Sequence, residues 1–155
     1  MDKIKKSFEE CKRKKLIIEA EPNIKNIKGH IEKAKHYLQA VDYNIAGGFQ
    51  DVAVANAFYS MYHALLALLQ KHGYEAKAQE CAINTVQYLI LMKKVYLDIK
   101  YIDLIRLTDK TKGKDAKSLR EELQYGTETS VNLVVLEELK KNAIEFVEAI
   151  EVLLY

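Results

Sequence analysis

The segment from Ala57 to Leu66 is apolar on almost every side of the helix that it predicts. A helix that is apolar all round has to be buried between neighbours, so this segment favours a helical bundle with this helix at its centre. Asn56, Ser60 and His63 follow one another at i, i+4 and i+7, and they therefore share one face. Because a polar group on a buried helix needs a partner or an open groove, we expect this polar thread to line a groove where function lies.

The rest of the chain also repeats apolar residues at helical spacing, and residues that break helices are scarce. The 155 residues include one proline and six glycines, and several glycines follow the end of an apolar pattern. The expected helices cover about residues 2–20, 24–46, 50–72, 78–94, 96–107, 118–124 and 131–154. No strand pattern outweighs the helical one, so we predict an all-α, mostly up-and-down bundle of five or six helices.

Length and composition indicate a single domain over residues 1–155, in which residues 1–22 form an additional N-terminal helix. Hydrophobic residues make up 49% of the chain and charged residues 30%, which predicts a soluble protein with a substantial core. The formal net charge of +2 gives no global argument for nucleic-acid binding. The charged N-terminus lacks a long apolar run, so neither a signal peptide nor a membrane span is expected.

The two cysteines, Cys11 and Cys81, lie far apart in the sequence, and there is neither a Cys-x-x-Cys motif nor a Cys/His cluster. We interpret both as reduced, small apolar residues of a cytoplasmic protein. The same absence of clustered ligands predicts no metal site and no cofactor.

Two basic stretches offer candidate phosphate contacts. The run from Lys12 to Lys15 is either a solvated helix face or a phosphate-contacting arm. Residues 109–117 form the longest polar interruption, and Lys112, Lys114 and Lys117 within it could attract phosphate. Acidic residues in the same stretch weaken that attraction.

Three segments occur together in an order and spacing that resemble one known family. They are Ala57–Ala64 (AFYSMYHA), Lys71–Lys77 (KHGYEAK) and Leu119–Gly126 (LREELQYG), the last before a final long helix. The chain resembles the HEPN family, a nucleotide-binding helical domain found in higher eukaryotes and prokaryotes. The resemblance extends from about Ile27 to Val152 and leaves the first helix outside.

The resemblance implies a bundle of four to five helices that forms a homodimer. Many members of the family are metal-independent ribonucleases, often the toxin of a toxin–antitoxin pair, and the antitoxin is frequently a small nucleotidyltransferase. The resemblance therefore implies RNA or a nucleotide as ligand and a nucleotidyltransferase as partner.

The family's catalytic signature is an arginine followed, after four to six residues, by a histidine, and two subunits bring these motifs into one cleft. Arg120 matches the arginine, but Tyr125 stands in the histidine position, and no histidine follows His72. In toxins with Arg-x4-His-x-Tyr the final tyrosine accepts adenylate, and here that position is Thr127. The chain thus departs from the signature at both the general base and the modification site.

RNA cleavage needs a base for the ribose 2′-OH proton and a cation for the developing phosphorane charge. Arg120 could bind phosphate oxygens bidentately, or it could form a salt bridge with a nearby carboxylate. Tyr125 is a poor base because a phenol titrates near ~10. It could still hydrogen-bond phosphate or stack on a base, or it could simply pack at a helix end.

His63 is the candidate histidine for proton transfer, since its unperturbed pKa of about 6.5 suits that role. The alternative is a buried, neutral histidine that bonds a backbone carbonyl or a neighbouring tyrosine. Asn56 and Ser60 could orient a ligand beside it, or they could belong to a closed polar network. The remaining histidines, His30, His36 and His72, are expected at the surface.

Three hypotheses follow. The first is an RNA-directed HEPN protein, a toxin-type ribonuclease with a degenerate Arg-x4-Tyr motif. The second is a non-catalytic, dimeric binding module for a nucleotide or a nucleotidyltransferase. The third is a structural dimer whose polar thread is internal. The first two require Arg120 and the polar thread to meet in one water-accessible hollow.

Overall fold

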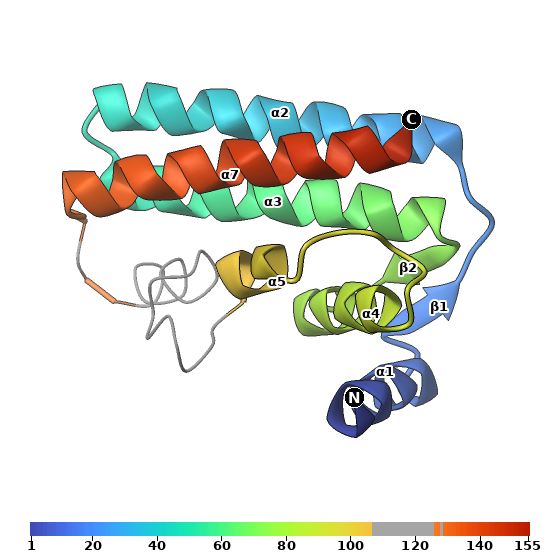
Figure 1. Cartoon of the computed structure of the whole chain (residues 1–155). Coiled ribbons are helices and arrows are strands. Elements are labelled where there is room, and N and C mark those ends of the chain that lie inside the picture. The colour runs from blue at the N-terminus through green and yellow to red at the C-terminus, as the bar shows by residue number, and fades with distance from the viewer. Residues whose placement is uncertain (107–125, 128) are drawn as a thin grey trace.

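Three long helices lie side by side and form the main body of the protein in this computed structural model, which describes residues 1–106, 126–127 and 129–155. They are α2 (Ile24–Ala46), α3 (Gln50–Lys71) and α7 (Leu133–Leu154). Figure 1 shows α2 running antiparallel to α3, while α7 packs against both and runs in the direction of α3. The predicted all-α helical bundle is confirmed.

Local sequence signals set the ends of these helices. The Asn23 side chain accepts hydrogen bonds from the backbone N–H groups of Lys25 and Asn26, at 3.0 and 3.2 Å, and so caps the start of α2. Asn132 caps α7 in the same way. Gly48 in the α2–α3 turn and Gly73 after α3 have φ of +81° and +84°, a conformation that favours glycine.

Helix α3 is the central element, as its apolar sequence predicts. Many of its side chains are fully buried, among them Phe58, Met61, Leu65 and Leu68. By length and composition α3 could also cross a membrane, but 61% of its most apolar window is buried inside the bundle. Packing against α2, α4 and α7 therefore accounts for its apolar surface.

Two shorter helices cover another side of α3. They are α4 (Gln79–Leu91) and α5 (Lys100–Ile105). In Figure 1, α4 and the N-terminal helix are seen nearly end-on, so they cross the long helices rather than extending the up-and-down pattern. Among the predicted elements, the polar stretch 109–117 and the short helix 118–124 lie outside the described residues.

The N-terminal segment differs from its prediction. Helix α1 (Asp2–Arg13) ends well before residue 20, and Lys15 follows it in a left-handed conformation with φ of 59°. Strand β1 (Ile17–Glu19) comes next and pairs antiparallel with β2 (Tyr74–Ala76). The expected helix over residues 2–20 is therefore too long, and the expectation of no strand is wrong for these two segments. The two β-branched residues of β1 are the local signal for a strand.

A small second core holds this N-terminal module (residues 1–20) against α4. It consists of Phe8, Cys11, Ile17 and Cys81, with Tyr74 and Tyr88 packed around them. The Phe8 ring stacks on Tyr88 with ring centroids 4.1 Å apart and meets Tyr74 edge-to-face at 5.9 Å. Aromatic pairs in these geometries contribute beyond the area that they bury.

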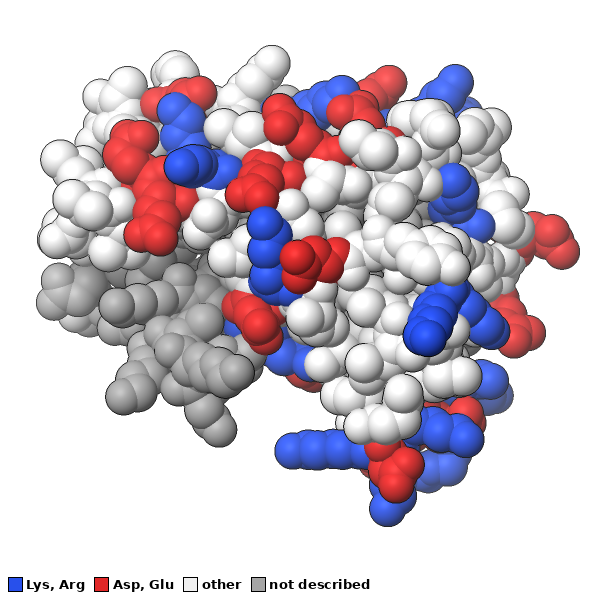
Figure 2. Space-filling view, in the orientation of Figure 1, with Lys and Arg blue, Asp and Glu red and all other residues white. Residues whose placement is uncertain are grey.

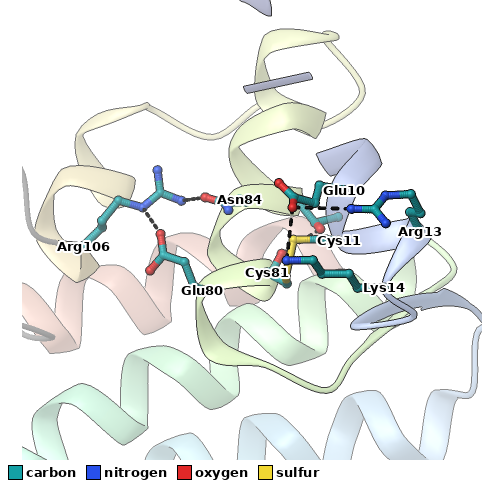
Figure 3. Close-up of a disulfide and its surroundings, with 9 residues drawn as sticks. Glu10, Cys11, Arg13, Lys14, Glu80, Cys81, Asn84 and Arg106 are labelled. Atoms are coloured by element: carbon teal, nitrogen blue, oxygen red, sulfur yellow. Dashed lines mark hydrogen bonds and ion pairs between the residues drawn. A yellow bond between two sulfur atoms is a disulfide. The ribbon is translucent and has the colours of Figure 1, made fainter. Parts of the chain in front are cut away.

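Cys11 and Cys81 form a disulfide that links α1 to α4, with Cα atoms 5.8 Å apart (Figure 3). The interpretation of both as reduced cysteines is wrong, because sequence separation says nothing about proximity when a strand pair returns the chain to α4. Disulfides persist mainly in oxidising compartments. The cytoplasmic location thus loses the support of reduced cysteines and stays a prediction.

Candidate functional site

The predicted polar thread on α3 divides between two environments. Ser60 is fully buried, and its hydroxyl donates to the Ala57 carbonyl oxygen at 2.7 Å. Asn56 and His63 are half-buried at the side of α3 that meets α2. The two environments differ because the three residues point in different directions around the helix axis. Ser60 lies about 40° to one side of Asn56, and His63 about 20° to the other. In this arrangement no ligand reaches the Ser60 hydroxyl, so the expectation that all three residues line one groove is wrong for Ser60.

A row of polar and aromatic pairs joins α2 to α3, and we call it the α2–α3 seam. Its residues are spaced seven apart on α2 and three to four apart on α3. Its members are His30, Tyr37 and Asn44 on α2 and Asn56, Tyr59 and His63 on α3.

Each pair of side chains in the seam is in direct contact. The Asn44 amide donates to Asn56 Oδ1 at 2.7 Å. The Tyr37 ring lies 5.7 Å from the Tyr59 ring and stacks on His63 at 5.6 Å with planes 18° apart. At the His30 end of the seam, the Nδ1 atoms of His30 and His63 are 3.1 Å apart. This is a hydrogen bond in which one ring donates and the other accepts.

The α2 half of this seam was missed from the sequence. His30 had been expected at the surface, but it is half-buried and bonded to His63. The signal was present in the spacing of His30, Tyr37 and Asn44, which recur every seven residues and so form one line along the predicted helix. What the sequence did not supply was the partner helix that the line faces.

Burial in the seam changes the protonation of both histidines. The pKa of His63 is lowered to about 4, mainly by desolvation and then by repulsion from His30 and Lys33. The pKa of His30 is also lowered, by desolvation and by Lys33. Both rings are therefore neutral near pH 7. A base with a pKa near 4 is a weak proton acceptor, so the expected pKa of about 6.5 for His63 is wrong in the folded protein.

A second polar cluster, also missed from the sequence, surrounds Arg106 at the end of α5. Its guanidinium donates to Gln87 Oε1 and to Asn84 Oδ1, the latter at 2.5 Å, and Nε lies 3.4 Å from Glu80 Oε1 (Figure 3). The three α4 residues share one face because they are spaced at i, i+4 and i+7. The cluster fixes the end of α5 to α4, immediately before residues 107–125.

The other predicted site residues fall in that segment. Arg120, Tyr125, Lys112, Lys114 and Lys117 lie outside the described residues, so whether Arg120 meets the seam stays a prediction. Within the described part of the chain no group of three or more histidine, cysteine or acidic side chains could hold a metal ion.

Surface charge gives no broad electropositive field on the side of the molecule seen in Figure 2. Lysines and arginines are interspersed there with acidic residues over most of the face. On α1, Glu10 pairs with Arg13 at 3.5 Å and with Lys14 at 3.0 Å. These contacts favour a solvated helix face for the run from Lys12 to Lys15 over a phosphate-contacting arm.

Comparison with known families accounts for the helical core and leaves the N-terminal module outside. The search of curated proteins found no matching relative. The family model described as the HEPN domain matches residues 27–153, which takes in α2, α3, α4, α5 and α7. Because this match covers most of the chain and agrees with the helical architecture, the protein belongs to the HEPN family.

Proposed function

We propose that this HEPN protein associates with RNA or a nucleotide and that Arg120 contacts phosphate. The observation that carries the proposal is the family match over residues 27–153. Arg120 lies within that range, and we assign it to the arginine of the Arg-x4–6-His signature. A guanidinium can hold two phosphate oxygens at once. Lys112, Lys114 and Lys117 precede it in the sequence and would add electrostatic attraction.

Binding is favoured over efficient cleavage. The histidine of the signature is replaced by Tyr125, and a phenol is protonated near neutral pH. His63, the remaining candidate base, is bonded to His30 and has a pKa of about 4. Without a general base matched to neutral pH, a metal-independent ribonuclease would lose about 10²–10⁴ in rate. We therefore propose slow ribonuclease activity at most.

Fluorescence anisotropy with a labelled single-stranded RNA tests the proposal. We expect saturable binding that weakens with salt, and Arg120→Ala should weaken it by about tenfold or more, equivalent to about 1.4 kcal/mol. Arg13→Ala is the matched control, because the Arg13 side chain is 71% exposed on α1, outside the family match. Equal affinity of Arg120→Ala and the wild type would reject Arg120 as the phosphate contact.

The same samples test catalysis. We expect the labelled RNA to stay largely intact over hours at pH 7 and His63→Gln to change little. Rapid cleavage by the wild type that is lost in His63→Gln would overturn our conclusion about this histidine.

A second candidate function is a dimeric module that partners a second copy or a nucleotidyltransferase antitoxin. Exposed apolar side chains at one end of the long helices favour it. Tyr43 and Phe49 lie at the α2–α3 turn, and Leu133 and Val134 begin α7. The N–H of Val131 donates to Gln50 Oε1 at 2.8 Å, which places the approach to α7 beside the start of α3.

Exposed apolar surface of this kind is typical of protein interfaces. Light scattering should give the mass of a dimer, and Val134→Glu should shift it toward the monomer. Val152→Glu, at an equally exposed site near the other end of α7, is the control. A monomeric wild type that also fails to bind a nucleotidyltransferase encoded beside it would remove this candidate.

A further inference from the structure

A small hollow of about 160 Å³ lies where α2, the end of α3 and β2 meet. It is lined by His30, Leu66, Gln70, Tyr74, Glu75 and Ala76. Clefts for drug-sized ligands measure about 300–1,000 Å³, so this hollow suits one functional group on a short chain. A wider hollow of about 460 Å³ shares Tyr74 and is bordered by Glu19 and Glu21.

Gln70 gives the hollow a fixed hydrogen-bond acceptor. The residue is 8% exposed, and its Nε2 donates to the Glu21 carbonyl oxygen at 3.1 Å. That bond orients the amide and leaves Oε1 without a hydrogen bond to any described residue. Among the described residues, Oε1 is not fully enclosed by protein. Because Gln70 lines the hollow, Oε1 opens onto it.

Glu75 adds a negative charge at the same place. Glu75 is exposed on β2 and belongs to the lining of the hollow. Its carboxylate forms no ion pair with the residues that the structure describes.

The charges that line the two hollows favour a cation. The two hollows together are lined by three glutamates, and neither is lined by a lysine or an arginine. Two lysines oppose this charge: Lys33, one helical turn beyond His30, acts electrostatically on that ring, and Lys12 acts on Tyr74.

We propose that this hollow binds a small organic cation, an alkylammonium or guanidinium group on a short aliphatic chain. Glu75 pairs with the charge, Gln70 Oε1 accepts an N–H, and the chain lies along Leu66 and Ala76. A free diamine and a basic side chain of another protein share this chemistry. None of the residues in this proposal belongs to the proposed RNA contact, so its test does not depend on that contact.

Titrations of the full chain followed by amide NMR test the site, with putrescine, agmatine and a capped lysine-containing peptide as probes. We expect saturable shifts confined to residues around 30, 66, 70 and 74–76. Tighter binding of the diamines would identify a free metabolite as the source, and tighter binding of the peptide a protein side chain. Absence of saturable shifts with all three probes at millimolar concentration would overturn the proposal.

Charge variants make the test specific. Glu75→Gln should weaken binding by about tenfold, as expected for the loss of about 1.4 kcal/mol. Lys33→Gln should tighten binding by about two- to threefold, in the range of a partly screened charge. Glu138→Gln, an exposed glutamate on α7, is the control and should leave affinity unchanged. Equal affinity of Glu75→Gln and the wild type would show that the probes bind elsewhere.

Discussion

The helical bundle and the N-terminal module are stabilised in different ways. The bundle encloses a continuous core of buried side chains from α2, α3, α4, α5 and α7. The module has one small cluster of buried residues, a pair of three-residue strands and the Cys11–Cys81 disulfide. Because a short helix that buries few residues is marginal in water, a covalent link supplies what packing does not. We therefore expect the module to unfold locally while the bundle stays folded.

The largest effect should come from the bundle core. Phe146 is fully buried on α7, and its ring meets Tyr101 edge-to-face at 5.7 Å. Phe146→Ala should lower the free energy of unfolding by about 3–5 kcal/mol, because it removes apolar contacts and leaves a cavity. Urea denaturation followed by circular dichroism measures this, and Phe49→Ala at an exposed site is the control. A loss below about 1 kcal/mol would mean that the bundle core is not close-packed.

Reduction should act on the module and leave the bundle folded. The disulfide closes a sequence separation of 70 residues, and such bridges contribute about 2–4 kcal/mol. In the Cys11→Ser/Cys81→Ser variant, hydrogen exchange should accelerate in α1 and β1, while α2, α3 and α7 stay protected. Equal acceleration in the three long helices would break the comparison, since it would make the module part of one cooperative unit.

Acidification should affect the bundle through the seam. The pKa of His63 is lowered to about 4 in the folded protein, so the unfolded chain binds a proton more readily. Stability is therefore complete above the unfolded value near 6.5 and declines as the pH falls from there to about 4. We expect a loss of about 1–2 kcal/mol, discounted because the ring is half-exposed.

Thermal unfolding at pH 7 and pH 4.5 measures this loss. In His63→Gln it should shrink, whereas His36→Gln, which alters an exposed histidine outside the seam, should retain it. If His63→Gln showed the same pH dependence of stability as the wild type, the acid sensitivity would not come from the seam.

Surface ion pairs should contribute least in both regions. Lys35 Nζ lies 2.6 Å from Glu151 Oε2 between α2 and α7, and its side chain is half-exposed. Exposed pairs contribute about 0.2–1 kcal/mol, so Glu151→Ala should lower stability by no more than that. Glu10→Ala on α1, which breaks two exposed pairs, should cost a similar amount. A larger loss of stability in either variant would mean that surface ion pairs contribute to the difference between the bundle and the N-terminal module.

The sequence by itself determined the elements whose signals are local. The apolar periodicity predicted α2, α3, α4 and α7 closely, and Asn23 marked the start of α2 because its side chain caps the backbone next to it. The burial of α3 followed from its being apolar on almost every side. Family membership followed from the order of three short sequence motifs and is confirmed.

Tertiary structure alone decided which residues meet. The pairing of Ile17–Glu19 with Tyr74–Ala76, which follows the left-handed Lys15, brought Cys11 to Cys81. His30 met His63 because α2 lies antiparallel to α3, and the resulting burial set their protonation. Helical spacing fixes which side chains share a face of one element, but contact between two elements depends on how distant apolar surfaces pack, which no local pattern encodes.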